Sequence, residues 1–112
     1  MRQKLAFTLL VASALASRNA AAGFESGNDL YRVCSSEEYL AKIDCLEYSV
    51  GVVDAMDRQN PVFGYVVCLP DDVTRGQIKD VALQFLVAHP ERRHLLAASL
   101  VAEALSAAFP CR

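Results

Sequence analysis

Four cysteines, Cys34, Cys45, Cys68 and Cys111, carry the most evident chemistry in the chain. Thiols can form disulfides, bind zinc or exchange electrons with other thiols. The spacings match neither a zinc site nor a Cys-x-x-Cys redox motif. An even number of cysteines in a small exported chain is typical of structural disulfides, and the N-terminal sequence described below indicates export. We therefore expect two disulfides and no bound metal.

His89, Glu91 and His94 form a second group with the residue types of a metal site. Pro90 lies in the middle of this group, and the spacing places no two ligands on one regular helical face. We expect instead that a histidine at a helix end binds the terminal carbonyl groups. The neighbouring Arg92–Arg93 pair is interpreted as part of a solvated turn.

Three carboxylates, Glu47, Asp54 and Asp57, fall on one predicted helix and could serve acid–base chemistry. The same helix carries apolar stripes, so these carboxylates are interpreted as its solvent-facing side. The sequence has no glycine-rich phosphate loop, and no serine lies in a nucleophile-elbow pattern. We therefore predict no catalytic residue, no cofactor and no metal, and we do not expect an enzyme.

Two helices are predicted in the last third of the chain, between Cys68 and Cys111. Thr74 and Gln77 have capping-box spacing, and His89-Pro90 ends the first helix. Its apolar stripe consists of Ile78, Val81, Ala82, Phe85 and Leu86. The second stripe consists of Leu95, Ala98, Val101, Ala102, Leu105, Ala108 and Phe109, and Pro110 ends that helix. A short connection makes the helices antiparallel neighbours and brings the two cysteines together. A 68–111 disulfide would contribute roughly 4 kcal/mol in the chain-entropy model.

One long helix is predicted from Glu37 to about Arg58, roughly 33 Å in length. Ser35 and Glu38 have capping-box spacing at its start. Its apolar residues form two adjoining stripes: Leu40, Ile43, Leu46, Val50, Val53 and Met56, and beside them Cys45, Tyr48, Val52 and Ala55. Such a helix is typical of the centre of a small bundle or of a dimer interface. Gly51 and Ala55 predict a close helix contact, either within the chain or between two copies.

A short helix from Asp29 to Val33, with Asn28 as its cap, is predicted before Cys34. The turn that follows brings Cys34 close to Cys45, and this loop would contribute about 3 kcal/mol in the same model. Local topology therefore favours the disulfides 34–45 and 68–111. The other two connectivities, 34–68 with 45–111 and 34–111 with 45–68, stay open at this point.

The segment from Gln59 to Val73 is the one long non-helical part of the predicted domain. Asn60-Pro61 and Gly64 are turn signals. Phe63 and Tyr65 place two large rings on this turn-rich loop. The rings either form a partner-binding tip or fold down over the bundle as part of its core. We name Asn60, Phe63 and Tyr65 as the candidate partner-binding residues.

The first 22 residues follow the pattern of a signal peptide, with a basic start, an apolar run from Leu5 to Ala16 and a small-residue site before Gly23. The apolar run is too short for a membrane span, which needs about 20 residues. We expect cleavage to leave a single all-α domain, residues 23–112, with about four helices. This domain has eight basic and thirteen acidic residues, a net charge of −5. Such a charge argues against nucleic acid and against anionic membrane surfaces as partners.

An ordered set of short motifs resembles the Rap/Tai-type immunity proteins of bacterial type VI secretion. The set runs through nearly the whole predicted domain: Gly27-Asn28-Asp29-Leu30, Cys34, Cys45-x-x-Tyr48-x-x-Gly51-x-x-Asp54-Ala55, Cys68-Leu69-Pro70, Thr74-x-x-Gln77, His89-Pro90-Glu91-x-Arg93 and Ala107-Ala108-Phe109-Pro110-Cys111. Glu47 departs from the pattern, because a small residue is expected before the tyrosine. The resemblance implies a small, exported, all-helical and often dimeric periplasmic protein. It also implies a protein partner, a peptidoglycan amidase toxin whose active-site groove is blocked.

A second function is an alternative on physical grounds. Thirteen carboxylates could open a helical, disulfide-bonded protein at acid pH and expose surface for unfolded clients. The sequence therefore leaves two hypotheses, a periplasmic immunity protein and a small periplasmic acid-stress chaperone.

Overall fold

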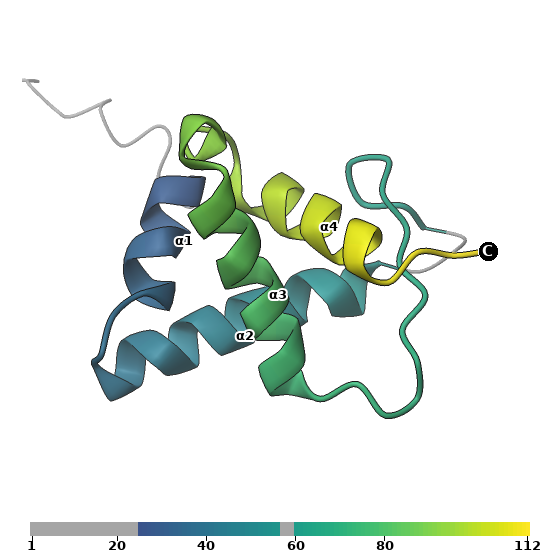
Figure 1. Ribbon diagram of the computed structural model, residues 1–112, viewed down its shortest axis with the longest axis horizontal. Coiled ribbons are helices and arrows are strands. Elements are labelled where there is room, and N and C mark those ends of the chain that lie inside the picture. The colour runs from purple at the N-terminus through teal and green to yellow at the C-terminus, as the bar shows by residue number, and fades with distance from the viewer. Residues whose placement is uncertain (1–24, 57–59) are drawn as a thin grey trace, which may run out of the picture.

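The computed structural model describes residues 25–56 and 60–112. Its elements are α1 (Gly27–Cys34), α2 (Tyr39–Ala55), α3 (Arg75–Ala88), the 3-10 turn η2 (Pro90–Arg92) and α4 (Ala97–Ala108) (Figure 1). The described ranges contain isolated β-bridges and no sheet, so the predicted all-α fold is confirmed. None of the helices in these ranges is long and apolar enough to cross a membrane. The predicted signal peptide lies outside the described residues.

Helix α1 begins at a capping box, and its N-cap is not the residue that sequence analysis named. Ser26, not Asn28, is the N-cap. The Ser26 hydroxyl accepts a hydrogen bond from the Asp29 backbone N–H at 3.1 Å, and the Asp29 carboxylate accepts one from the Ser26 backbone N–H at 3.0 Å. These reciprocal bonds satisfy two N–H groups that the start of a helix leaves unpaired, so the helix extends back to Gly27.

Residues 25–28, here called the entry segment, pair with the connection between α3 and α4. The backbone N–H groups of Gly27 and Asn28 donate to Leu95 and Arg93, at 2.8 and 2.7 Å. In return, the Ala97 N–H donates to the Glu25 carbonyl at 2.8 Å. The two backbones approach so closely that a Cβ on Gly27 would lie 2.8 Å from the Arg93 carbonyl oxygen. The absence of a side chain at position 27 is therefore a packing requirement.

The connection after α3 is more ordered than the solvated turn that was predicted for Arg92–Arg93. The Arg93 side chain donates from Nε to the Leu86 carbonyl at 2.7 Å, and its guanidinium lies 3.6 Å from the centre of the Tyr31 ring. Arg92 makes two hydrogen bonds to the Glu103 carboxylate, at 2.9 and 2.5 Å. That prediction was wrong because both guanidinium groups have specific partners on neighbouring helices.

Helix α2 is shorter than predicted, with 17 residues and a length of about 26 Å. Ser35 does not cap it, because the Ser35 hydroxyl donates back to the Tyr31 carbonyl at the end of α1. The N-cap is Glu38, which makes no side-chain capping bond. The helix ends at Ala55 because Met56 adopts an extended conformation. The predicted end at Arg58 lies outside the described residues.

The buried face of α2 consists of Cys45, Ser49, Val50 and Val53, and Met56 is buried just beyond it. Leu40 and Ala55 were assigned to the apolar stripes, but both are exposed, Leu40 by 72%. Gly51 is exposed too, and no other part of the described chain would lie within 4 Å of its Cβ. The close contact predicted at Gly51 and Ala55 is therefore not made by residues 25–56 or 60–112.

Helix α3 has the predicted cap and buried face, whereas α4 differs from its prediction in where it starts and in which residues it buries. The Thr74–Gln77 capping box is present, and Ile78, Ala82 and Leu86 are buried as predicted. Helix α4 starts later than its predicted stripe, so Leu95 lies in the connection and is 39% exposed. Its buried residues cover a broader face than one stripe because α4 packs against α1, α2 and α3: Ala97, Leu100, Val101, Ala102, Ala104 and Leu105.

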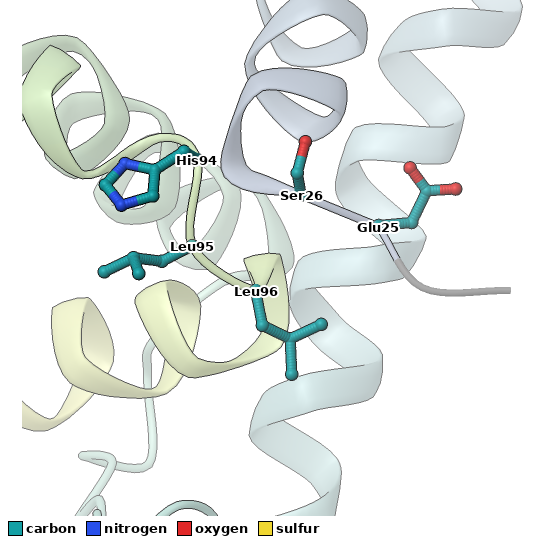
Figure 2. Close-up of a pocket in the computed structure, with 5 residues that line it drawn as sticks. All are labelled: Glu25, Ser26, His94, Leu95 and Leu96. Carbon is teal, nitrogen blue, oxygen red and sulfur yellow. The ribbon is translucent and has the colours of Figure 1, made fainter. Parts of the chain in front are cut away.

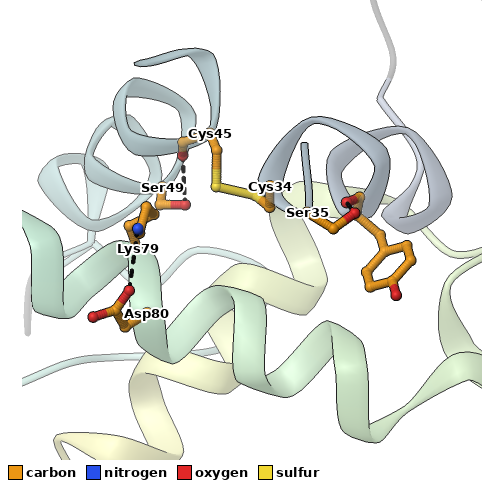
Figure 3. Close-up of a disulfide and its surroundings, with 7 residues drawn as sticks. Cys34, Ser35, Cys45, Ser49, Lys79 and Asp80 are labelled. Atoms are coloured by element: carbon orange, nitrogen blue, oxygen red, sulfur yellow. Dashed lines mark hydrogen bonds and ion pairs between the residues drawn. A yellow bond between two sulfur atoms is a disulfide. The ribbon is translucent and has the colours of Figure 1, made fainter. Parts of the chain in front are cut away.

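Both disulfides join the cysteine pairs that local topology favoured. Cys34 and Cys45 link α1 to α2, with Cα atoms 4.9 Å apart, and are buried (Figure 3). Cys68 and Cys111 have Cα atoms 5.0 Å apart and link the segment before α3 to the residues after α4. With sequence separations of 11 and 43, the two bonds stabilise the fold by roughly 3 and 4 kcal/mol in the chain-entropy model.

The close approach at Gly27 predicts a large effect of a single methyl group. In Gly27→Ala the new Cβ would lie 2.5 Å from Leu100 Cδ1 and 2.8 Å from the Arg93 carbonyl oxygen. We expect a loss of about 1–3 kcal/mol in the free energy of unfolding, measured by urea denaturation. Gly76→Ala is the matched control, because the same methyl group in the first turn of α3 would meet its nearest neighbour at 3.8 Å. The control should be neutral or stabilising by up to about 1 kcal/mol, and equal losses in both variants would contradict the packing argument.

The α1 capping box predicts a pH dependence. Hydrogen bonds from the Ser26 backbone and hydroxyl hold the pKa of Asp29 below its usual 3.8, with a smaller contribution from Arg32. The stabilisation from the ionised carboxylate is therefore complete above about pH 4 and is lost as the pH falls through the folded-state pKa. We expect Asp29→Asn to lower the urea midpoint at pH 7, and this loss should become smaller as the pH falls below about 4. If Asp29→Asn lowers the urea midpoint by the same amount at pH 7 and at acid pH, the charge of Asp29 does not contribute to stability.

Candidate partner-binding surface

The segment between α2 and α3 contains a tight hairpin tip, residues 62–65. The Val62 backbone N–H donates to the Tyr65 carbonyl at 3.0 Å, and the Tyr65 N–H donates to the Val62 carbonyl at 2.9 Å. The two central residues both have positive φ angles, 51° for Phe63 and 83° for Gly64. Positive φ at both central positions is the signature of a type I′ turn, for which Asn-Gly is the preferred pair.

Phe63 is an unusual residue for the first central position of this turn. Among the described residues it is the one non-glycine side chain with a positive φ. Bulky side chains avoid this region because the Cβ crowds the backbone, at a cost of about 1–3 kcal/mol. The residue is 56% exposed, so core packing does not offset most of this cost. A strained backbone that displays an aromatic ring is a feature found at binding sites.

The two rings named from the sequence have different environments. Tyr65 is half-buried and packs against the hydrophobic core, whereas Phe63 extends into solvent. Asn60 is exposed, two residues before the turn. The structure therefore separates the two rings: Tyr65 fits the core interpretation, and Phe63 stays a candidate for partner binding.

The base of the tip is firmly attached to the bundle. Val67 is buried, with 7% of its surface exposed. The next residue, Cys68, donates its backbone N–H to the Phe109 carbonyl at 2.9 Å and is bonded to Cys111. Figure 1 shows the resulting loop projecting beside the C-terminal end of α4. The tip is thus a short projection on an immobilised base.

Two further exposed apolar residues lie at the start of α2. Tyr39 and Leu40 are 75% and 72% exposed. Figure 1 shows this end of α2 on the side of the bundle away from the hairpin tip, so the two surfaces are separate. The sequence missed this pair, because Leu40 fits the apolar stripe that continues into the core.

Two small cavities lie near the entry segment. The first has a volume of about 200 Å³ and is lined by Glu25, Ser26, His94, Leu95 and Leu96. Figure 2 shows the imidazole, the hydroxyl and the carboxylate of these residues pointing away from one another. They form no hydrogen-bonded nucleophile and base, the arrangement that nucleophilic catalysis requires.

The second cavity, about 170 Å³, is lined by Glu25, Leu30, Val33, Asp44 and Tyr48. Burial raises the pKa of Tyr48, and the nearby Glu25 carboxylate raises it further. The Tyr48 phenol is therefore neutral across the physiological pH range, as in most proteins.

The three residues weighed as metal ligands do not form one site, because only His89 and Glu91 are in contact. His89 Nδ1 lies 3.2 Å from a Glu91 carboxylate oxygen, and its ring lies against Phe85 with centroids 4.4 Å apart. A hydrogen bond from its own backbone and the contact with His89 lower the pKa of Glu91. His94 lines the first cavity instead. Within residues 25–56 and 60–112, no three histidine, cysteine or acidic side chains could hold a metal ion together.

The carboxylates considered for acid–base chemistry are on the surface of α2. Glu47 forms an ion pair with Arg75 at the start of α3, and both side chains are more than half exposed. Asp54 is exposed, and Asp57 lies outside the described residues. The prediction that Glu47 and Asp54 lie on the solvent-facing side of the helix agrees with these positions.

The turn type at residues 62–65 is a feature that sequence analysis missed. Gly64 was recognised only as a turn signal. The pair Phe63-Gly64 also lies between two apolar β-forming residues, Val62 and Tyr65, which is the pattern of a hairpin with a two-residue loop and glycine at its second position. That pattern would have placed Phe63 at a left-handed position, and therefore at the tip.

Comparison with known proteins identifies the family. The family model described as Rap1a immunity proteins matches residues 26–111, which include all four helices and both disulfides. No curated protein matches the chain at a significant level. Since the family model spans most of the sequence, the chain belongs to the Rap1a immunity protein family.

Proposed function

We propose that this protein is exported to the periplasm and there binds a secreted peptidoglycan amidase, whose active site it blocks with the hairpin tip. Membership of an immunity family supports a protein toxin as the partner. We choose this surface because of Phe63, an aromatic residue that has a strained backbone conformation and is 56% exposed. In this proposal the signal peptide is residues 1–22 and the functional domain is residues 23–112.

A rigid projection with one aromatic residue is well suited to tight binding. Aromatic side chains dominate the energetics of protein interfaces when they enter a closed pocket of the partner. Binding also costs conformational entropy, and a preorganised loop loses less of it. Attachment at Val67 and Cys68 restricts the loop before the partner arrives. Phe63 would then insert into the enzyme groove while Asn60 and Tyr65 contact its rim.

The charge of the protein supports the same proposal. The domain from residue 23 onward has a net charge of −5, by the residue count given above. Opposite net charges raise the rate of association through electrostatic steering, an effect that salt screens. If the amidase is basic, association should therefore slow as the ionic strength rises.

Homodimer formation is part of this proposal and concerns a different surface. Gly51 and Ala55 are exposed on α2, and nothing in the described chain occupies the space above Gly51. If a second copy packs there, Gly51→Ala should shift sedimentation toward the monomer. If the protein is monomeric, the same substitution should only stabilise α2, by up to about 1 kcal/mol.

Phe63→Asn gives the sharpest test of the binding surface. Asparagine tolerates positive φ, and Asn-Gly is the preferred pair for this turn, so the free energy of unfolding should stay equal or rise by up to about 1 kcal/mol. Loss of the ring should weaken binding to the amidase by about 30-fold or more. Calorimetry and urea denaturation on the same sample measure both effects.

Leu40→Asn is the matched control, because it removes an exposed apolar side chain from the other side of the bundle. We expect native affinity in this control. Weak binding by Leu40→Asn together with native binding by Phe63→Asn would move the site to the start of α2.

The function itself is tested by co-expression. The protein should restore growth to cells that carry an amidase toxin of the type VI class in the periplasm, and Phe63→Asn should fail to do so at equal abundance. Continued lysis with the native protein would count against amidase immunity. The acid-stress alternative makes a separate prediction, which is that the protein reduces light scattering from an unfolding client at low pH.

A further inference from the structure

The two disulfides differ in their access to solvent. Cys34 and Cys45 are 7% and 0% exposed, in the core between α1 and α2 (Figure 3). Cys68 and Cys111 are both partly exposed and lie outside the helices. A thiolate must reach one sulfur atom to open a disulfide, so access strongly affects which bond reacts first.

The two bonds also differ in what they hold in place. Cys34–Cys45 joins two helices that pack against each other through buried side chains. Cys68–Cys111 joins the base of the hairpin tip to the end of α4, three residues after Tyr65. When the second bond opens, the helices keep their apolar contacts, whereas the tip loses its covalent attachment to the bundle.

We propose that Cys68–Cys111 is a redox-controlled latch on the hairpin tip. A dithiol reductant opens this bond while Cys34–Cys45 stays closed, and the opened protein keeps its helical bundle but loses the fixed orientation of Phe63. The protein is therefore competent to bind its partner only after oxidation. This inference rests on the proposed function, because it concerns the same tip.

The reaction is ordinary thiol–disulfide exchange. One thiolate of the dithiol attacks a sulfur of the Cys68–Cys111 bond, forms a mixed disulfide and releases the other cysteine as a thiolate. The second thiol of the reagent then displaces the remaining cysteine and leaves the reagent as a disulfide. Cys68 and Cys111 together gain two electrons and two protons. Closure is the reverse reaction, in which a disulfide-bearing oxidant accepts the two electrons and two protons.

Selective opening is tested on the native, oxidised protein with increasing concentrations of dithiothreitol. Free thiols are trapped with iodoacetamide and located by mass spectrometry. We expect Cys68 and Cys111 to become alkylated at a dithiothreitol concentration at least 10-fold below that needed for Cys34 and Cys45. Simultaneous alkylation of all four cysteines, or earlier alkylation of Cys34 and Cys45, would overturn the latch.

Loosening of the tip is tested by fluorescence, because the chain contains no tryptophan. Phe63→Trp places a single indole at the tip. Opening of Cys68–Cys111 should lower the anisotropy of this indole while the far-ultraviolet circular dichroism stays within about 10% of its oxidised value. The double substitution Cys68→Ser and Cys111→Ser, in the same background, should give the low anisotropy without reductant. Unchanged anisotropy, or joint loss of the helical signal, contradicts the proposal.

Binding separates a failure of the latch from a failure of the proposed function. The probe is the amidase used in the co-expression experiment. The Cys68→Ser and Cys111→Ser variant should bind it at least 10-fold more weakly than the oxidised native protein. If the double variant binds as tightly as the native protein, the latch is wrong and the proposed function stands. If native protein and Phe63→Asn bind equally well, the tip is not the site, and both proposals about it fail.

Discussion

The backbone pairing of residues 25–28 with residues 93–97 is the constraint on which the bundle depends. It attaches α1 to the connection between α3 and α4, so elements from both ends of the domain share one contact. Gly27 permits the close approach, and Arg93 completes it by accepting the Asn28 N–H, bonding the end of α3 and covering Tyr31. A domain of about 90 residues buries only part of its apolar surface, so such a contact matters more than it would in a larger protein.

Against this well-packed framework, the hairpin tip is an exception. Each of the α-helices in the described residues places apolar side chains in the core, whereas the tip places Phe63 in solvent and in an unfavourable backbone conformation. An Asn-Gly pair would form the same turn with less strain. A sequence optimised for stability alone would not have phenylalanine at this position, and this is the physical reason for the proposed binding role of the tip.

Sequence analysis predicted those features that depend on local chemistry. The Thr74–Gln77 capping box, the end of α3 at His89-Pro90 and both disulfides follow from short-range rules about caps, proline and helix hairpins. The errors arose where distant segments decide the outcome. Arg93 was assigned to solvent because its partners, Tyr31 and the end of α3, are adjacent to it only in the folded protein.

The same distinction explains the errors in the helix faces and in the candidate site. Periodicity showed that Leu40 shares a face with core residues, but it could not show that the first turn of α2 extends past every neighbouring helix. For the loop, composition identified two exposed-ring candidates without separating them. The backbone bonds between Val62 and Tyr65 turn one ring inward and the other outward, and this separation depends on a turn type that spacing alone did not reveal.

The positions of the two disulfides suit two different purposes, one in stabilising the core and the other in holding the loop that carries Phe63. The buried Cys34–Cys45 bond strengthens a hairpin of helices that already share a core. The partly exposed Cys68–Cys111 bond holds a segment with little helical structure, in which Val67 is buried in the core and Val62, Tyr65 and Val73 pack against it. A loop of this kind loses the most order when its cross-link is missing, because few buried contacts replace it. In the proposed latch, the orientation of Phe63 therefore depends on the disulfide that lies outside the buried core.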